Sequence, residues 1–571
     1  MASFNKLPFE LHHNIVQYLD NDSAKSLRLA YPTPKIIATT GATVFKTLVL
    51  RLGNHKNSRT KLDNLRSCLL TENNEIDLST NGTLTHVRTL VVDTRYPFVV
   101  TDEFTWTRSK WRTSGHLNMP SNSRCLADCA EIVPDEELNS FLDLFTKVLS
   151  TISGRLKSLR WQTSDLLPFP VYDQIAKLLF SPMVLIQKKY EFTVSHTFAA
   201  PYALTQYLKP LSSCDRLEII GASTKSTEEE IDRIDMAAVA ELISRCHGLK
   251  SFNYTYQTWV DADCFDILWG AINNLETLEE LQLHTSENMI GSVKPNLSKL
   301  KRLKKISFDC SEYLYYILDG HPVYAVFDSL VTTGIDGITK LSVGGVYTDN
   351  IQKLLLQQKA ITDLNLHISS KADILRIFAL IIPAVAGTLR CFRISGAVEG
   401  QPWGWSDKRT DGRGLLKCKK LQEIEFPFIE RNFLLTGEGT VINSLPTLIN
   451  DFVRSCPELI RIHTGSIAAD YNVASSLINV LTDFRSMDEI FKGRDIEIML
   501  RQRTEGEWGS SRCRTRFPRS GNEEDLVGVF DYYIHRWRLR EETADGGEEK
   551  VYRFERIEDK CWMRNECWED D

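Results

Sequence analysis

The chain carries none of the short motifs that mark a bond-making or bond-breaking site. Gly-x-Ser-x-Gly, the phosphate-binding glycine-rich loops and His-Glu-x-x-His are all absent from its 571 residues. Cys125 and Cys129 lack the paired spacing of a zinc site, as do Cys561 and Cys567. We therefore expect no catalytic residue, no metal and no cofactor, and we expect the side chains of this protein to act by binding.

Tryptophan and arginine gather in three insertions of otherwise polar sequence. Residues 400–414 contain Trp403 and Trp405 among glycines, 101–133 contain two further tryptophans, and 504–521 contain four arginines. Trp and Arg are the residues most enriched at binding hot spots. We expect Trp403 and Trp405 to contact a protein partner. The alternative is that one or both pack back onto the body of the protein.

A second candidate surface consists of polar residues that alternate with apolar ones. Glu280, Lys305, Arg393 and Arg461 are the members that we expect to bind a partner's polar groups. Because the set is mixed in sign, it lacks the converging arginines of a phosphate-reading surface. Taken singly, each residue is more often part of a solvated face without a ligand, and only as a set do they mark where a protein partner would lie. The full set is Arg160, Asn253, Glu280, Gln282, Lys305, Ser307, Lys340, Asp363, Asn365, Arg393, Glu423, Glu425, Arg461 and His463.

These residues belong to a short pattern, Leu-x-x-Leu-x-Leu with other apolar residues allowed, that recurs along the chain. The copies begin at Val87, Leu156, Leu249, Leu278, Leu303, Ile338, Ile361, Leu389, Leu421 and Leu459, with a weaker copy at Leu217. From residue 249 onward the starts fall 29, 25, 35, 23, 28, 32 and 38 residues apart. This is the pattern of leucine-rich repeats lengthened by insertions. It predicts an α/β solenoid, a curved parallel sheet with helices on its convex side.

The segments between copies have helical spacing in places. Residues 228–245 show it most clearly, and 261–275 and 373–387 are similar. Between Val92 and Leu217 copies are sparse, so at least one repeat there is degenerate or interrupted. An α/β enzyme would also alternate strands and helices. Its strands would be longer apolar runs, however, and not one template repeated ten times.

The first thirty residues follow a different pattern. Pro8 suits the opening turn of a helix, and Leu11, Ile15 and Leu19 recur every four residues, so they form one apolar stripe. Residues 20–23 end this helix and provide a cap for a second one. Small helices of this kind bury too little apolar surface to be stable alone. The stripe is therefore expected to pack on a partner.

This N-terminal segment resembles the F-box, the adaptor-docking module of cullin-based ubiquitin ligases. The matching residues are Leu7, Pro8, Glu10, Leu11, Ile15, Leu19 and the Leu27-Arg28-Leu29 run. Residues 44–51 resemble the segment that follows the F-box in many fungal members. The chain departs from the family at Tyr31-Pro32-Thr33-Pro34, which replaces a usual small or sulfur residue followed by a basic and an aromatic one. The alternative is an ordinary amphipathic helical cap on the repeats.

The resemblance implies a substrate-recognition subunit of a cullin-type E3 ubiquitin ligase. A Skp-family adaptor, and through it a cullin, would bind at Leu7, Pro8, Glu10, Leu11, Ile15, Leu19 and Leu27. The repeats would bind the target protein, and the chain would supply proximity without bond chemistry. One rival is a leucine-rich-repeat scaffold without a ligase role. A second is a hydrolase or transferase on an α/β fold.

Composition sets limits on partners and compartment. The net charge of −7 argues against a nucleic-acid or anionic-membrane surface. The longest apolar stretch, 377–387, is too short to span a bilayer, and the N-terminus does not read as a signal peptide. Thirteen scattered cysteines fit reduced, mostly buried thiols. We expect a protein of the cytoplasm, the nucleus or both.

The end of the chain is rich in aromatic residues. Residues 529–539 and 551–557 flank a Gly-Gly pair and are expected to form a closing hairpin, although the first of them could equally form a helix. A solenoid needs its last repeat covered. The expected domains are thus an F-box at 1–45, a solenoid at 46–500, and a flexible basic segment with a C-terminal cap at 501–571.

Overall fold

The protein is α/β, with 17 strands among the residues that its computed structural model describes. These residues are 21–30, 34–52, 83–94, 135–164, 167–180, 186–194, 203–211, 213–221, 229–256, 262–285, 295–310, 323–344, 347–367, 376–395, 412–426, 449–467, 481–503, 532–543 and 550–562, with residues 11, 15, 16, 19, 66, 67, 69, 70 and 75. The chain divides into two compact units. One comprises 1–106 and 122–254, and the other comprises 107–121 and 255–571.

The N-terminal segment is helical where it is described. Leu11 and Ile15–Val16 have helical backbone. Helix α2 (Asn21–Ala30) ends directly before Tyr31-Pro32, and proline disfavours helical backbone in the residue before it. Helix α3 (Pro34–Val44) begins on a proline, which suits a first turn. Of the sequence that departs from the F-box pattern, residues 31–33 therefore separate two helices and Pro34 begins the second.

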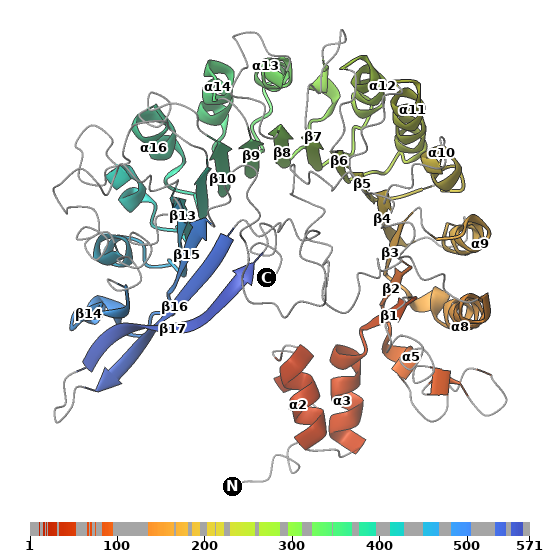
Figure 1. Cartoon of the computed structure of the whole chain (residues 1–571), viewed down its shortest axis with the longest axis horizontal. Coiled ribbons are helices and arrows are strands. Elements are labelled where there is room, and N and C mark those ends of the chain that lie inside the picture. Colours follow the sequence, from red (N-terminus) through yellow and green to blue (C-terminus); the bar gives the residue numbers. More distant parts are fainter. Residues whose placement is uncertain are drawn as a thin grey trace, which may run out of the picture. The chain divides into compact units, whose positions relative to one another are not determined.

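The first unit continues as a parallel sheet backed by helices. Its strands are β1 (Thr47–Arg51), β2 (Thr89–Asp93), β3 (Ser158–Ser164), β4 (Gln187–Val194) and β5 (Arg216–Gly221), each paired in parallel with the next. Helices α5 (Thr83–His86), α8 (Asp135–Ile152), α9 (Phe169–Leu179), α10 (Ala203–Leu208) and α11 (Glu229–Arg245) lie along one side of these strands (Figure 1). The boundary between the units falls within β6 (Ser251–Tyr256).

The second unit repeats the arrangement with shorter helical arms. Its parallel strands are β7 (Glu280–Thr285), β8 (Lys305–Cys310), β9 (Lys340–Gly344), β10 (Asp363–His367), β11 (Cys391–Ser395), β12 (Glu423–Phe426), β13 (Arg461–Ile467) and β15 (Glu497–Arg503). Its arms include α12 (Ala262–Ile272), α13 (Val323–Thr333) and α14 (Asp349–Gln357), and 3-10 turns η3 (Leu297–Lys299) and η6 (Gly412–Lys417).

One backbone contact recurs at the start of the strands. The carbonyl of Glu279 accepts hydrogen bonds from both Lys304 N–H (2.8 Å) and Lys305 N–H (3.0 Å). The carbonyl of Lys304 does the same for Thr339 and Lys340. Further carbonyls that accept from two consecutive N–H groups are those of Lys46, Arg88, Asp215, Thr339, Thr362, Arg390 and Gln422. The contact fixes where each strand begins relative to the previous one, so the length of an insertion does not change the stacking.

The predicted core positions are buried. In β7, Leu281 and Leu283 are fully buried, and Leu278 turns in ahead of them. In the first unit large aromatic residues fill the same layer, with Trp161 of β3 against Tyr172 of α9 and Tyr190 of β4. Their polar atoms have partners: the Tyr172 and Tyr190 hydroxyls lie 2.8 Å apart, and Trp161 Nε1 donates to Thr94 Oγ1. Burial of these apolar and aromatic side chains is the main source of stability.

The sequence pattern missed β4. Tyr190 and Phe192 of this strand fill the two inward positions and are fully buried. Gln187 stands where the template needs its first apolar residue, so the copy goes unrecognised. The sparse region between Val92 and Leu217 thus contains two strands, β3 and β4. The apolar surface that a leucine would supply at position 187 is replaced by the larger rings that follow it.

The predicted arm at 373–387 is helical where it is described, with one irregular turn. After the helical Arg376, a π-helical turn, η5 (Ile377–Ile381), is followed by α16 (Ile382–Val385). Pro383 has no N–H to bond the carbonyl four residues earlier, which favours the wider turn. The predicted helices at 228–245 and 261–275 are confirmed as α11 and α12.

The chain's aromatic end forms a hairpin and not a helix. Strands β16 (Tyr532–Thr543) and β17 (Lys550–Trp562) pair in antiparallel fashion, and β16 also pairs with β15. The short β14 (Arg485–Ser486) pairs with β17. The inward side chains of the hairpin, including Trp537 and Tyr552, are buried. The predicted basic segment, which includes Arg512 and Arg519, lies outside the described residues.

Among the described helices, none combines the length and the apolar character that crossing a bilayer requires.

Candidate functional site

The N-terminal helices expose apolar side chains. Leu29 is 82% exposed, Leu11 46% and Ile15 38%. At the same time Val16 and Ala24 are buried, so the segment has its own apolar interior as well as an outward apolar surface. An exposed leucine alone is unremarkable in a soluble protein. Three exposed apolar residues within about twenty residues of one small helical segment are a candidate binding surface.

The structure describes four of the seven predicted adaptor-binding residues. Leu11 and Ile15 are exposed, and Leu19 and Leu27 are partly exposed. Leu7, Pro8 and Glu10 lie outside the described residues. The predicted set does not include Leu29, which lies near the end of α2 and is more exposed than Leu27.

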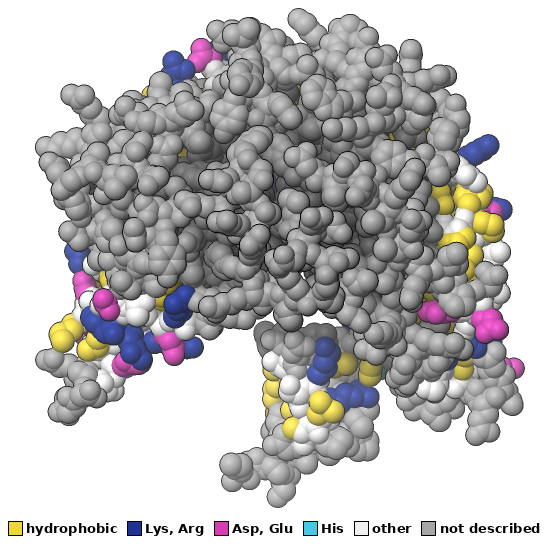
Figure 2. Space-filling model, viewed as in Figure 1, with side chains coloured by type: hydrophobic (Ala, Val, Ile, Leu, Met, Phe, Trp, Pro, Cys, Tyr) yellow, Lys and Arg dark blue, Asp and Glu magenta, His cyan; other side chains and the backbone are white. Residues whose placement is uncertain are grey.

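Basic and aromatic contacts hold the C-terminal end of α2. The guanidinium of Arg28 lies 4.8 Å from the centre of the Phe45 ring, at the end of α3. Such cation–π contacts are worth about 0.5–1 kcal/mol where they are exposed. Figure 2 shows basic and hydrophobic side chains together over these helices. This contact links the end of α2, which carries Leu29, to the end of α3.

The open face of the second unit's sheet carries a row of charged residues. In the pairing register these residues lie directly opposite one another on consecutive strands. The row reads Glu280, Lys305, Lys340, Asp363, Cys391, Glu423, Arg461 and Glu497. All four polar residues that the sequence predicted as partner-binding lie on this face, three of them in this row and Arg393 in the next.

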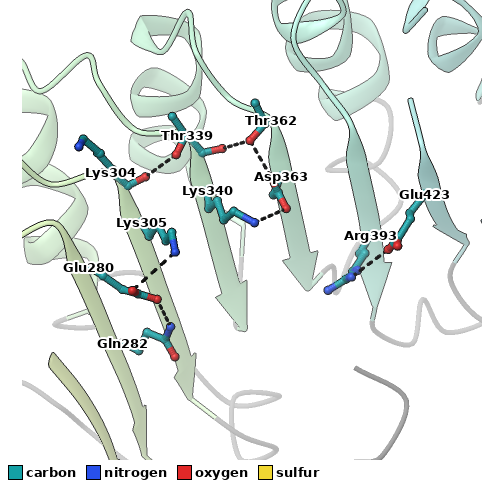
Figure 3. A network of polar contacts seen from close by, with 10 residues as sticks. All are labelled: Glu280, Gln282, Lys304, Lys305, Thr339, Lys340, Thr362, Asp363, Arg393 and Glu423. Carbon is teal, nitrogen blue, oxygen red and sulfur yellow. Dashed lines mark hydrogen bonds and ion pairs between the residues drawn. The ribbon is translucent and has the colours of Figure 1, made fainter. Parts of the chain in front are cut away.

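Neighbouring members of the row form ion pairs (Figure 3). Lys305 Nζ lies 3.6 Å from Glu280 Oε2, and Gln282 Nε2 donates to Glu280 Oε1 over 2.7 Å. Lys340 Nζ lies 2.8 Å from Asp363 Oδ1. Opposite charges on adjacent strands contribute about 0.2–1 kcal/mol each. The lysine ends remain about half exposed, at 44% and 50%, so they stay accessible to another molecule.

Glu423 joins the two predicted arginines. Arg461 Nη1 lies 3.0 Å from Glu423 Oε1, and Arg393 Nη2 lies 3.2 Å from Glu423 Oε2. The side chain of Glu423 is only 14% exposed, whereas those of the arginines are 28% and 31% exposed. Each carboxylate oxygen thus binds one guanidinium, and the side chains of both arginines stay partly exposed.

Two residues of the predicted face are not solvated. Glu425 is 8% exposed and His463 is 2% exposed, although both alternate with core residues as predicted. They lie opposite each other on β12 and β13. The solvated alternative therefore does not hold for these two residues, because strand position fixes the side on which a residue points and not what surrounds it. Trp403 and Trp405 lie outside the described residues.

A second polar cluster, in the first unit, was largely missed. Glu191 of β4 is 1% exposed and accepts from Arg160 Nε (2.6 Å), Lys189 Nζ (2.7 Å) and Gln162 Nε2 (2.8 Å). Lys189 also lies 3.4 Å from Glu218. Only Arg160 was among the predicted residues. Lys189 and Glu191 depend on recognising β4 as a strand, after which their alternation with Tyr190 follows, whereas Gln162 lies on β3 and Glu218 on β5.

The described cysteines are free thiols. Cys214, Cys246, Cys418 and Cys456 are buried, and Cys391 is partly buried. Burial raises the pKa of Cys246 and Cys456 to about 11 and that of Cys418 to about 12. Thiols that stay protonated are poor nucleophiles and poor metal ligands. No group of His, Cys, Asp and Glu suited to a metal ion occurs in the part of the chain that the structure describes.

Comparison with known proteins yields no relative: no protein-family model matches the chain, and no curated protein matches its sequence.

Proposed function

We propose that this chain is the substrate-recognition subunit of a cullin-type E3 ubiquitin ligase. Its N-terminal helices would bind a Skp-family adaptor, and the open strand face would bind the target protein. The observation that carries the proposal is the exposure of Leu11, Ile15 and Leu29 on helices that precede a repeated parallel sheet. Under this proposal the chain performs no bond chemistry.

The exposed leucines support the adaptor side of the proposal. Burying exposed aliphatic side chains against a partner removes apolar surface from water, which favours binding. The helices present them with little freedom, because Val16 and Ala24 are buried beneath. A surface that is already ordered loses less entropy on binding.

The charged row supports the target side. Its lysines and arginines are held by carboxylates and are still partly exposed, so their positions are set before a partner arrives. Such an arrangement favours a protein partner whose own charges alternate along the strand face. The mixed sign is poorly suited to a polyanion such as nucleic acid.

The proposal is tested by recovering the tagged full-length chain from cells with the proteasome inhibited. A Skp-family adaptor and a cullin should be recovered in stoichiometric amounts, together with a ubiquitinated target. Recovery of a protein target without adaptor or cullin would instead identify a leucine-rich-repeat scaffold. An enzyme on an α/β fold would be indicated by turnover of a small substrate without either.

A further inference from the structure

A pocket lies at the amino ends of three adjacent strands of the first unit. Its volume is about 560 Å³, and it opens where β3, β4 and β5 begin. Five polar residues line it, namely Lys157, Gln187, Lys188, Ser213 and Asp215. None of these residues belongs to the charged row or to the exposed apolar residues of the N-terminal helices.

Lys188 is the unusual member of this pocket. It shares the inward side of β4 with Tyr190 and Phe192, and it is 4% exposed. Lysine is almost never this buried unless it is paired. Its Nζ lies 3.5 Å from Ser213 Oγ and 5.3 Å from the centre of the Phe180 ring. No carboxylate among the described residues forms an ion pair with it.

The nearest acidic residue is already engaged. Asp215 Oδ2 accepts a hydrogen bond from the main-chain N–H of Lys188 over 2.8 Å, so this carboxylate holds the strand and not the ammonium. A buried ammonium without a counter-charge costs several kcal/mol. Consistent with that cost, burial lowers the pKa of Lys188, and nearby Cys214 and Asp215 only partly oppose the shift.

The donors around Lys188 suit an anion with several oxygens. The exposed Lys157 supplies a second ammonium, Ser213 a hydroxyl and Gln187 an amide. A phosphate monoester offers three strong acceptor oxygens and a charge near −2, which would compensate both lysines. The volume exceeds what a phosphate alone needs, and Leu156 and Ile186 supply apolar wall for the group that carries it.

We propose that this pocket binds a phosphate monoester, with Lys188 as its buried cation and Lys157, Gln187 and Ser213 as further donors. The phosphate could belong to a small metabolite or to a phosphoserine side chain, since both present the same group. The inference is independent of the proposed ligase role, because it involves neither the N-terminal helices nor the charged row.

The first test is calorimetric titration of the full-length protein at constant ionic strength with O-phosphoserine, inorganic phosphate and aspartate. Saturable binding of O-phosphoserine is expected, at least tenfold tighter than that of aspartate. In Lys188→Met this affinity should fall by tenfold or more, and in Lys157→Met by a few-fold. Lys177→Met is the matched control, because Lys177 lies on α9 in the same unit, outside the pocket and paired with Asp173.

Inorganic phosphate shows whether the group that carries the phosphate is recognised as well. Tighter binding of O-phosphoserine than of phosphate would show that the organic group contacts the apolar wall, and equal binding would show that phosphate alone is recognised. Absence of saturable heat with both probes up to about 10 mM would overturn the proposal, since this range covers millimolar dissociation constants. Unchanged affinity in Lys188→Met would overturn it as well.

A second test uses the wild-type protein only, so it does not depend on how a variant folds. An amine-acylating reagent is applied with and without phosphate at equal ionic strength, and modified peptides are quantified by mass spectrometry. Inorganic phosphate, which has no amine to consume the reagent, should slow acylation of Lys188 severalfold and leave Lys177 unchanged. Equal protection of both lysines, or of neither, would contradict a site at Lys188.

Discussion

Arg461 binds Glu423 across the boundary between two strands, with Nη1 and Oε1 3.0 Å apart. The same carboxylate binds Arg393 on its other oxygen. Because β12 lies between the strands of the two arginines, Glu423 determines how far apart their guanidinium groups are. Two residues that the sequence predicted separately as partner contacts are therefore one structural group.

Neutralising Glu423 should destabilise the second unit. Glu423→Gln removes a negative charge that two partly buried guanidinium groups share, so we expect a loss of about 1–2 kcal/mol. Asp349→Asn is the control, because its pair with Arg376 is 76% exposed on the aspartate side and 50% on the arginine side; such pairs are worth about 0.5 kcal/mol or less. Thermal unfolding followed by circular dichroism measures both. Equal midpoints for the two variants would contradict the special role of Glu423.

Charge reversal on the strand face should weaken capture of the target. Arg461→Glu places two carboxylates side by side and removes an accessible guanidinium, so recovery of the target should fall at least tenfold. Arg376→Glu, at the start of the helical arm on the other side of the sheet, should leave recovery unchanged. The readout is quantitative mass spectrometry of proteins recovered with the tagged chain. If Arg461→Glu and Arg376→Glu recover the target equally, the strand face is not its site.

The tryptophans of the 400–414 insertion provide an independent check of the same site. Trp403→Ala/Trp405→Ala should reduce target recovery by tenfold or more, because an indole anchors a large apolar area at little entropic cost. Substitution is preferable to a long deletion, since η6 begins at Gly412 and its Leu415 is fully buried. The midpoint of unfolding should stay within about 1 °C of wild type. A drop of several degrees would show that the tryptophans are core residues.

The buried thiols predict a loss of stability at alkaline pH. Burial raises the pKa of Cys246 and Cys456 to about 11, whereas a thiol in the unfolded chain titrates near about 8.5. Above the lower value the unfolded state releases protons that the folded state keeps, so stability falls from about pH 8.5 to about pH 11. Denaturant midpoints at about pH 8 and about pH 10 measure this fall. In Cys246→Ala/Cys456→Ala the fall should be smaller; an identical fall would exclude these thiols as its cause.

The sequence predicted those features that depend on an apolar period. The strands at 280–285, 305–310 and 461–467 were located by their buried positions, and the alternation placed Glu280 and Lys305 on the open face. Strand β4 was not predicted, because Gln187 occupies the first apolar position of the repeat pattern. Tyr190 and Phe192 supply the buried area of this strand. The sequence did not decide between a hairpin and a helix at the end of the chain, because its aromatic residues fit both the two-residue period of a strand and the spacing of a helix.

Contacts between distant residues could not be predicted in the same way. The burial of His463 and of Glu191 depends on what neighbouring strands and arms place around them, which no local pattern encodes. Lys188 was missed for the same reason. Its isolation from carboxylates follows from the engagement of Asp215 with the backbone, a detail of geometry and not of spacing.

The most direct test of the central claim is the dissociation constant between the full-length chain and a purified Skp-family adaptor. Leu11→Ala/Ile15→Ala should weaken binding at least thirtyfold, because truncating one aliphatic anchor costs about 2 kcal/mol. Leu356→Ala/Leu380→Ala is the matched control, since these residues are 47% and 45% exposed on arms of the second unit, and its affinity should equal that of wild type. Wild-type affinity in the Leu11→Ala/Ile15→Ala variant, or no binding by wild type at all, would contradict the assignment of an adaptor-docking module.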